Sequence, residues 1–461
     1  MLPPPRLDYR SISENFVSKS TNAINRKAPI TVEAIQSVSR LYNELKHHSN
    51  TLNAKRNSRS VIGEAIRKSA LQKDQKAKNA AMEDAKKLKE EISELETLVS
   101  QTEQTLLETA LAIPNDTHPS SPLGPESAAV ILASHGPDPI PVTPTRDHVA
   151  IGKKLGWVDL ENASSTTGSS WYYLTNEGAL LEMALTNYAL SVAIKHGFKP
   201  VTTPDVVRSD IARRCGFQPR DPSNAHVSQV YHLQNTSPAH SPELVLSATS
   251  EIPLAGLFAN QLFLSSSLPM KVVGVGHAFR AEAGASGADT RGLYRVHQFT
   301  KVELFSVTTE DKSEGMMEEM RRVQTAILDG LRLPFRILDM PTEELGASAY
   351  RKYDMEVWMP GRGRWGEVSS LSNCTDFQAR RLLIRYHPQT PKSSEGPTPT
   401  STANKFAHTL NGTAAAVPRL IVALIENGIV LDESGEPVAL ELPSVLRPFW
   451  LGDDNLIRWQ S

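Results

Sequence analysis

Charged residues of both signs crowd one stretch of the chain, from His277 to Phe305, which reads HAFRAEAGASGADTRGLYRVHQFTKVELF. Arg280 and Glu282 are spaced two apart, and residues at that spacing share one face of a β-strand. An arginine there suits a phosphate or a carboxylate, because its planar guanidinium pairs with either through two hydrogen bonds. A glutamate beside it can accept a hydrogen bond from an exocyclic amine. A surface ion pair is the commoner origin of this spacing, so the pattern alone does not establish a nucleotide site.

A nucleotide site in this chain would have to work without a phosphate-binding loop. The pattern G-x-x-x-x-G-K-[ST] is absent, and GVGHAF (274–279) only half matches a dinucleotide fingerprint. Arginines would then take the phosphates and a carboxylate would hold Mg²⁺. Phe299 and Arg419 are candidates to stack on the two faces of the base.

The length and composition limit the elements that can position such groups. A chain of 461 residues with 39% hydrophobic residues and a formal net charge of −2 is typical of a soluble protein of two domains. The two cysteines, Cys215 and Cys374, are too few for a disulfide framework or a four-cysteine zinc site. The N-terminal segment is Ser-rich and modestly basic, which favours a mitochondrial transit peptide.

Residues 31–112 predict an antiparallel helical hairpin. They contain no proline, and their one glycine is Gly63. The second half carries a heptad seam formed by Leu88, Ile92, Leu95, Val99, Thr102 and Leu106. Residues 55–89 carry eleven lysines and arginines against four acids, so the tip of the hairpin is basic. A solvated helix face explains this charge, and so does a phosphate-backbone contact.

The remainder predicts a second domain of the α+β class. A Pro- and Ser-rich stretch, residues 114–146, is expected to be a linker between domain 1–113 and domain 147–461. Residues 177–197 have helical spacing and end on Gly197. Strand patterns follow at 270–279, 294–307, 335–340 and 353–360, without a regular βαβ repeat, which favours an antiparallel or mixed sheet.

Three distant segments, taken together, resemble the signature motifs of class II aminoacyl-tRNA synthetases, in the form of the seryl-tRNA synthetases. GFKPVTTPDVV (197–207) resembles motif 1, residues 279–304 resemble motif 2, and TLNGTAAAVPRLIVALIENG (409–428) resembles motif 3. TSE (249–251), WGEVSSLSNCTDFQARR (365–381) and the helical arm are also similar to the seryl enzymes. The resemblance implies a serine–tRNA ligase with a helical-hairpin arm and an antiparallel-sheet catalytic domain.

The resemblance also implies roles for individual residues. Arg280, Glu303 and Arg419 would be catalytic. Serine would be bound by Thr249, Ser250, Glu251, Arg280, Glu303, Asn411 and Thr413. ATP would be bound by Arg280, Ala281, Glu282, Val296, Phe299, Glu367, Val368, Ser369, Ser370 and Arg419. Mg²⁺ would be coordinated by Glu367 and Ser370. Pro418, where glycine is common in the family, fixes φ and lacks an N–H just before Arg419.

The implied partners are tRNA(Ser), serine and a second copy of the chain, with no membrane. The bacterial and organellar branch is favoured, and hence the mitochondrial matrix, with the cytoplasm as the alternative. Two other functions stay open at this point. One is a non-catalytic paralogue that binds tRNA or seryl-adenylate; the other is a sister class II ligase for threonine or proline. The Pro/Ser/Thr-rich run 387–404 is expected to be a loop.

Overall fold

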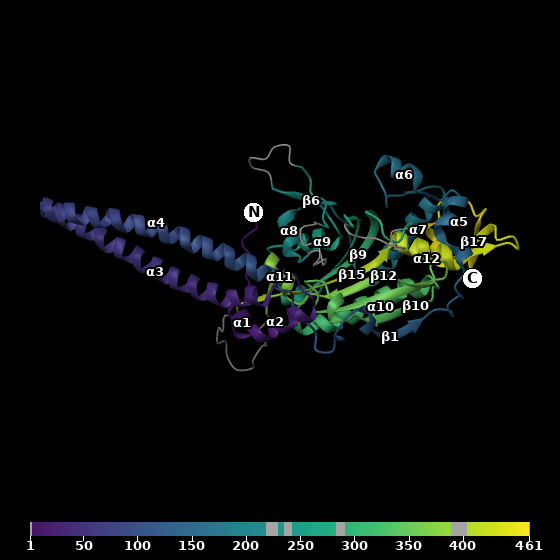
Figure 1. Cartoon of the computed structure of the whole chain (residues 1–461), viewed down its shortest axis with the longest axis horizontal. Helices are drawn as coiled ribbons and strands as arrows, with labels where there is room; N and C mark the ends of the chain where they lie inside the picture. Colours follow the sequence, from purple (N-terminus) through teal and green to yellow (C-terminus); the bar gives the residue numbers. More distant parts are fainter. Residues whose placement is uncertain (1, 218–228, 235–241, 283–290, 389–402, 461) are drawn as a thin grey trace. The chain divides into compact units, whose positions relative to one another are not determined.

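The computed structural model describes residues 2–217, 229–234, 242–282, 291–388 and 403–460. They form two compact units, one of Leu7–Pro114 and a larger one of Met1–Arg6 with Asn115–Ser461 (Figure 1). The run 387–404, predicted to be a loop, lies mostly outside the described residues.

The smaller unit is a helical hairpin with two short helices at its base. Its helices are α1 (Tyr9–Glu14), α2 (Phe16–Asn25), α3 (Val32–Leu71) and α4 (Gln75–Leu111). The two long helices lie side by side and antiparallel (Figure 1). Each has an N-cap whose side chain accepts a backbone N–H: Thr31 from Ala34 (3.2 Å) and Asp74 from Ala77 (3.0 Å). The Asp74 cap lies at the turn 72–74, where the predicted hairpin reverses, and the Thr31 cap lies at the opposite end of α3.

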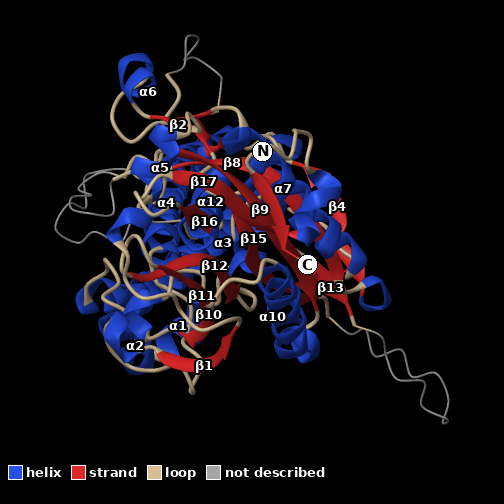
Figure 2. Ribbon diagram, turned by 90° about the vertical axis from the view of Figure 1, so that its right-hand side faces the viewer, coloured by secondary structure: helices blue, strands red, loops and turns tan. Residues whose placement is uncertain are grey.

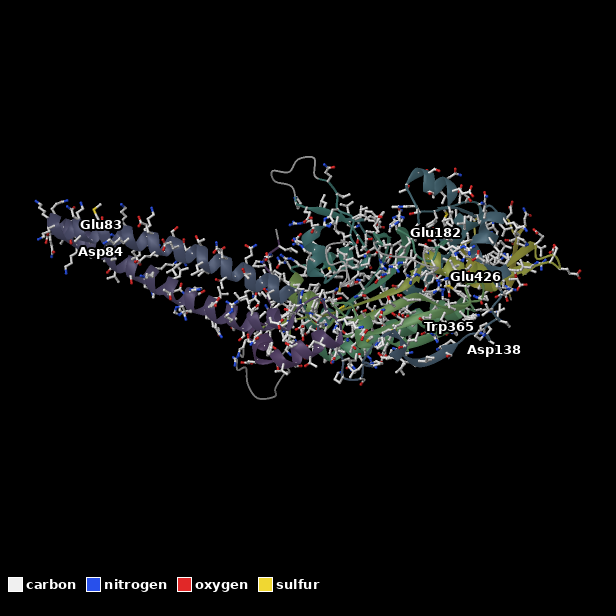
Figure 3. All side chains as sticks on the ribbon, viewed as in Figure 1. Glu83, Asp84, Asp138, Glu182, Trp365 and Glu426 are labelled. Carbon is white, nitrogen blue, oxygen red and sulfur yellow. The ribbon has the colours of Figure 1, made fainter. Side chains whose placement is uncertain are left out.

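The heptad seam holds the two long helices together. Leu88, Ile92, Thr102 and Leu106 are buried, as the spacing predicts. Two ion pairs cross between the helices, Lys55 Nζ to Glu91 Oε2 (2.5 Å) and Arg56 Nη2 to Glu96 Oε1 (2.8 Å). Figure 3 shows Glu83 and Asp84 at the far end of the hairpin, among the basic side chains of its tip.

The segment that composition assigns to a transit peptide is folded here. Ile12 of α1 and Ala23 of α2 are buried in one apolar cluster with Ile35 of α3 and Leu106 of α4. Residues 9–25 are therefore an integral part of the base of the hairpin, and the mitochondrial interpretation draws no support from this segment.

The larger unit is built on an eight-stranded sheet with the order β1-β10-β11-β12-β15-β9-β8-β4. All neighbouring pairs are antiparallel except β4 with β8. The sheet strands are β1 (Val130–His135), β4 (Lys199–Thr202), β8 (Met270–Phe279), β9 (Gln298–Thr308), β10 (Phe335–Asp339), β11 (Arg351–Met359), β12 (Arg364–Asn373) and β15 (His408–Ala416). The mixed, largely antiparallel sheet confirms the predicted α+β class.

Helices and small sheets surround the central sheet (Figure 2). The remaining α-helices are α5 (His148–Lys154), α6 (Glu161–Thr166), α7 (Glu177–Lys195), α8 (Ser209–Arg214), α9 (Glu251–Leu257), α10 (Ser313–Gly330), α11 (Phe377–Leu382) and α12 (Val417–Gly428). The remaining strands are β2 (Val158–Asp159), β3 (Tyr173–Leu174), β5 (Val206–Arg208), β6 (Leu244–Leu246), β7 (Leu262–Leu264), β13 (Arg385–His387), β14 (Lys405–Phe406), β16 (Ile429–Leu431), β17 (Pro437–Pro443) and β18 (Ile457–Gln460). Within the described residues, no helix is both long and apolar enough to cross a membrane.

The sheet separates two apolar cores. Alternate residues of β9 face opposite sides: Val302 and Leu304 pack with α7, α10 and α12, whereas Phe305 and Val307 pack with α9 and α11. By the same alternation, Lys301 and Glu303 face the side of α9. This side carries the site described below.

The Pro-rich stretch expected to be a linker belongs to the larger unit. Residues 130–135 form β1, which pairs with β10 at the edge of the sheet. Proline and glycine flank this short apolar run, VILASH, and their abundance in the window hides the strand from a compositional reading. Residues 115–146 therefore contribute an edge strand, not only a connection.

Candidate active site

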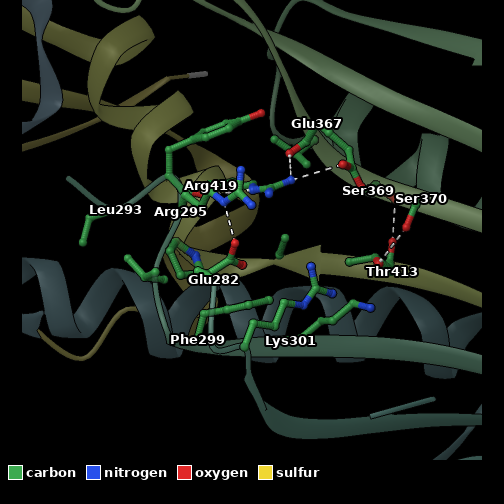
Figure 4. A pocket seen from close by; sticks show the side chains of 16 residues that line it. Glu282, Leu293, Arg295, Phe299, Lys301, Glu367, Ser369, Ser370, Thr413 and Arg419 are labelled. Carbon is green, nitrogen blue, oxygen red and sulfur yellow. Dashed lines mark hydrogen bonds and ion pairs between the residues drawn. The ribbon is translucent and has the colours of Figure 1, made fainter. Parts of the chain in front are cut away.

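Most of the residues predicted to bind a nucleotide gather around one cavity (Figure 4). Arg280, Glu367 and Arg419 come from three distant segments of the chain and line it together. The other lining residues are Glu282, Leu293, Tyr294, Arg295, Val296, Phe299, Lys301, Val368, Ser369, Ser370, Thr413, Ala416 and Pro418. An adjoining cavity shares Arg280, Glu367 and Arg419 and adds Thr249, Glu251 and Asn411.

The prediction that Arg280 and Glu282 share one face of a strand is wrong. Strand β8 ends at Phe279, and Glu282 has a positive φ of 45°. The carboxylate of Glu282 is held by Arg295, Nε to Oε2, at 2.5 Å. The Arg280 guanidinium carbon lies 5.3 Å from the centroid of the Phe299 ring. Both charged side chains line the same cavity from the segment that follows the end of the strand, and the spacing could not reveal that the strand stops before them.

Arg419 is fixed at the N-terminus of α12. Its Nε donates to the Tyr294 carbonyl (3.1 Å) and its Nη1 donates to the Glu367 carbonyl (2.8 Å). Its guanidinium carbon also lies 4.6 Å from the Tyr294 ring centroid. Pro418 occupies the first turn of the helix, where a missing backbone N–H costs nothing because that N–H has no partner within the helix. The unusual proline is therefore compatible with the placement of Arg419.

A β-bulge brings Glu367 and Ser370 to the same cavity. Residues three apart on a regular strand face opposite sides. Along β12, however, Glu367 pairs with Glu356 and Ser369 pairs with Met355, so β12 holds one extra residue at Val368. The extra residue reverses the alternation, and Val368 joins the apolar core while Glu367 and Ser370 both line the cavity.

The cations around Glu367 keep its carboxylate ionised. Burial raises its pKa, but Lys352, Arg419 and Arg280 outweigh burial and bring the pKa to about 2. Arg419 Nη1 lies 3.3 Å from Glu367 Oε2. Burial lowers the pKa of Arg280, and the neighbouring charge of Arg419 lowers it further. A cavity with two close guanidinium groups attracts a polyanion such as a triphosphate.

The adjoining cavity holds the residues predicted to bind serine. Glu251 Oε1 accepts hydrogen bonds from Gln378 Nε2 (2.5 Å) and Asn411 Nδ2 (3.0 Å). Burial raises the Glu251 pKa to about 7, and the charge of Glu303 contributes to the rise. Lys301 Nζ contacts Thr249 Oγ1 (3.1 Å) and Glu303 Oε2 (2.6 Å). Both acids could pair with an ammonium group when they are ionised.

Three predicted residues do not line either cavity. Glu303 is 1% exposed and lies under the ammonium of Lys301. Ser250 is buried behind Gly276, where an added Cβ would meet its hydroxyl at 2.6 Å. Ala281 follows Arg280 in the chain, and its backbone N–H donates to the Gln229 carbonyl (3.0 Å). These three residues therefore lie close to the two cavities but do not line them.

Several groups that complete the site were not predicted from the sequence. Lys301 stands two residues before Glu303 on β9, and the alternation of the strand could have paired them. Tyr294, Arg295 and Gln378 carried no signal of their own, because their partners lie far away in the sequence. Both cysteines are buried and neither forms a disulfide with a described residue, and burial raises the pKa of Cys215 well above its usual value.

Two sequence families match the chain. The tRNA synthetase class II core domain (G, H, P, S and T) matches residues 231–428, and the seryl-tRNA synthetase N-terminal domain matches residues 7–117. Together they contain every residue predicted to bind a substrate, and they also contain the helical hairpin.

Individual relatives match nearly the whole chain. It is 40% identical to the mitochondrial serine–tRNA ligase of Schizosaccharomyces pombe, over 96% of this chain and 88% of the relative. It is 39% identical to the serine–tRNA ligase of Treponema denticola, over 96% and 98%. Among solved structures, the seryl-tRNA synthetase of Pyrococcus horikoshii complexed with ATP is similar, with a TM-score of 0.80 and 32% identity, over 96% of this chain and 98% of the other.

Proposed function

Because this chain belongs to the seryl-tRNA synthetases and is a serine–tRNA ligase, we propose that the cavity shared by Arg280, Glu367 and Arg419 is its active site. The enzyme activates serine with ATP to form seryl-adenylate and transfers the seryl group to tRNA, releasing AMP and diphosphate. The observation that carries the proposal is the convergence of those three residues, from three separate segments, on one cavity.

The first reaction needs charge and position more than it needs a proton acceptor. A serine carboxylate oxygen attacks the α-phosphorus of ATP, the new P–O bond forms, and the bond to diphosphate breaks. The nucleophile is already ionised, so no general base is required. Arg280 would bridge the serine carboxylate and the α-phosphate, where negative charge develops. Glu282 would accept from the adenine amine, and Phe299 and Arg419 would stack on the base.

The serine side chain and ammonium would lie between Thr249, Glu251, Asn411 and Thr413. Lys301 now pairs with Glu303, so the ammonium of serine would share that carboxylate with the lysine or displace it. A pocket built from polar groups rejects alanine, because the missing hydroxyl leaves those groups unpaired, at a cost of roughly 10⁴ in specificity.

The residues present fit a Mg²⁺ ion bound together with ATP. Glu367 is ionised and Ser370 offers a hydroxyl on the same face of β12, both in the cavity of the two arginines. Mg²⁺ prefers oxygen ligands and is usually held by one or two carboxylates together with substrate phosphates. When bound there, the ion would neutralise phosphate charge. Glu367 and Ser370 would hold it.

The helical hairpin would bind the tRNA. Its tip carries the excess of lysine and arginine in residues 55–89, on a hairpin long enough to follow a nucleic-acid backbone. Contacts to phosphates tolerate sequence and weaken as salt rises. We therefore assign the hairpin to tRNA binding and domain 147–461 to catalysis, with 1–113 as the arm.

A homodimer is proposed from the edge of the sheet. Val130, Ile131 and Leu132 are each about half exposed (50%, 53% and 46%). They are consecutive in β1, so both faces of this edge strand are uncovered. An edge strand with exposed apolar side chains is a ready surface for another strand. Sedimentation should give a dimer for the wild type, and Ile131→Asp should shift it toward monomer.

The mitochondrial matrix is proposed as the compartment, with the cytoplasm as the alternative. The S. pombe relative is mitochondrial, whereas the T. denticola relative is bacterial. Imaging of the tagged full-length chain in cells would decide between them.

The proposed site is tested by ATP–diphosphate exchange with a panel of amino acids. Serine should support exchange, and the exchange rates with alanine, threonine and cysteine should be far below the rate with serine. Charging of mitochondrial and cytosolic tRNA preparations should follow. Exchange that threonine or proline drives as well as serine would contradict the proposed pocket.

A further inference from the structure

Strands β12 and β15 form a fork at the active site. They pair only from Leu371 with Gly412 to Asn373 with Leu410. Beyond that point β12 continues with β11 alone and β15 continues with β9 alone. Ser370 and Thr413 are the first residues past the split, one on each strand, and both line the nucleotide cavity. The fork therefore opens where the proposed metal ligand and the serine pocket face each other.

One buried side chain crosses this fork. Gln324 of α10 is 1% exposed, and its Nε2 lies 2.8 Å from the Ser370 carbonyl, 3.0 Å from the Thr413 carbonyl and 2.9 Å from Ser369 Oγ. Ser369 Oγ in turn donates to the Thr413 carbonyl at 2.5 Å. These bonds tie together two strands that no longer share a ladder.

The neighbours of Gln324 determine which way its amide points. Two of its three contacts are carbonyl oxygens, which only accept, so the amino group must face the fork. Its own carbonyl oxygen has no hydrogen-bond partner among the described residues. The polar interactions of Gln324 thus consist of donation from the amino group to the two strands.

The fork also sets a distance inside the site. Ser370 Oγ lies 3.4 Å from Thr413 Oγ1, across the split (Figure 4). If the strands separate, both hydroxyls move relative to Arg280 and Glu367. A shift of about 1 Å in such groups is enough to lower a rate roughly 10²-fold.

We propose that Gln324 is a positioning residue that sets the width of this fork and so fixes Ser370 against Thr413 for the joining of serine to ATP. The inference rests on the proposed active site and adds a residue that touches no substrate. Loss of the amino group removes the hydrogen bonds to the Ser370 and Thr413 carbonyls at the same time. Binding of serine and binding of ATP should therefore both weaken.

The test is Gln324→Met, which keeps length and volume but donates no hydrogen bond. Binding of a sulfamoyl analogue of seryl-adenylate, measured by calorimetry without added metal, should weaken about 10- to 100-fold. The serine and ATP KM values should both rise in the exchange assay. The matched control is Ile327→Val, a buried change on the same helix that contacts no polar group of the fork. It should lower the thermal midpoint but leave the analogue affinity within twofold of wild type.

Two further variants keep the test decisive. Ser369→Ala removes the second hydrogen bond to the Thr413 carbonyl. It should also weaken binding of the analogue, but less than Gln324→Met does. Gln324→Glu can donate only when it is protonated, and burial raises the pKa of such a carboxyl. Its analogue affinity should therefore fall as pH rises, relative to wild type, whereas that of Gln324→Met should not.

The outcomes separate the two proposals. Wild-type exchange driven by serine tests the active site independently of Gln324. Analogue affinity within twofold of wild type in Gln324→Met overturns the role of Gln324. Should that variant fail to fold, unchanged affinity in Ser369→Ala together with a wild-type pH profile in Gln324→Glu would overturn it equally.

Discussion

The guanidinium carbon of Arg419 lies 4.6 Å from the centroid of the Tyr294 ring, and Arg419 Nε also donates to the Tyr294 carbonyl at 3.1 Å. Tyr294 thus supports, with both ring and backbone, the arginine proposed to stack on adenine. A second guanidinium, that of Arg362, has its carbon 3.4 Å from the same centroid. The ring also lines the cavity proposed to bind the nucleotide.

The first prediction concerns this ring. Tyr294→Leu should raise the ATP KM about 3- to 10-fold, because a cation–π contact contributes roughly 0.5–1 kcal/mol or more when it is desolvated. Tyr294→Phe keeps the aromatic face and should stay close to wild type. Steady-state exchange at varied ATP measures both. Equal KM values for the Leu and Phe variants would show that the ring does not support Arg419.

The second prediction concerns Arg280. Arg280→Ala should lower serine-dependent exchange roughly 10²- to 10³-fold, because a charge that stabilises the transition state is lost. Arg447→Ala is the matched control, since Arg447 is an exposed arginine 4.0 Å from Asp454 and is absent from the cavity lining. Wild-type exchange in Arg280→Ala would remove this residue from the α-phosphate.

The third prediction concerns the metal. Glu367→Gln should increase the Mg²⁺ concentration needed for half-maximal exchange by about tenfold or more, because a neutral amide binds Mg²⁺ poorly compared with a carboxylate. Glu356→Gln alters the cross-strand neighbour, which pairs with Arg336 at 2.7 Å, and should leave the Mg²⁺ requirement unchanged. A Mg²⁺ titration of each variant gives the answer. Identical titrations in all three proteins would argue against Glu367 as a ligand.

The fourth prediction is a pH dependence. The pKa of Glu251 is raised to about 7 by burial and by Glu303. Only the ionised carboxylate attracts the serine ammonium, so the serine KM should fall as pH rises from 6 to 8. Glu251→Gln should have a higher KM and a flatter profile. A wild-type slope that persists in Glu251→Gln would assign the titration to another group.

The raised pKa of Glu251 also makes the free energy of unfolding depend on pH. The folded-state pKa of Glu251 lies above the value of about 4.3 for an unfolded glutamate. Its contribution to the free energy of unfolding is therefore fully present below about pH 4.3 and is lost as the pH rises through about 7. The free energy of unfolding of ligand-free Glu251→Gln should therefore decline less over this window than that of wild type. Denaturant titrations at pH 5 and pH 8 measure the difference.

The fifth prediction separates the arm from catalysis. Replacing residues 57–90 with a short Gly-rich turn keeps the ion pairs at Lys55 and Arg56 but removes the basic tip. Exchange should be unchanged, because serine and ATP are proposed to bind in the larger unit and not in the arm. Charging of tRNA should fall about 10²-fold or more at moderate salt, as lost phosphate contacts imply. Full charging by the shortened protein would refute the role of the arm.

The sequence was most informative about regular helices and strands, whose residue spacing repeats along the chain. The heptad seam from Leu88 to Leu106 predicts the hairpin, and the apolar run 270–279 coincides with β8. The helix 177–197 ends as expected before Gly197, whose φ of 84° suits glycine. These elements depend on local spacing, which a sequence displays directly.

Irregular backbone was the part that the sequence could not reveal. Arg280 and Glu282 line one cavity from beyond the end of β8, and Glu367 and Ser370 share a face through a bulge. Strand β1 was hidden among prolines. Lys301 was missed although it stands beside Glu303, because the resemblance named one and not the other. For β1 the determining partner, β10, is distant in sequence and near in space.

Val368 is a residue of β12 that has no partner of its own in β11. A strand of the same length without that bulge would turn Ser370 to the face opposite Glu367, whereas deletion of Val368 would leave the two residues two apart and on one face. The shared facing of the two oxygen donors therefore depends on the bulge itself, and a change that flattens it without shortening the strand should be harsher than most substitutions in this segment.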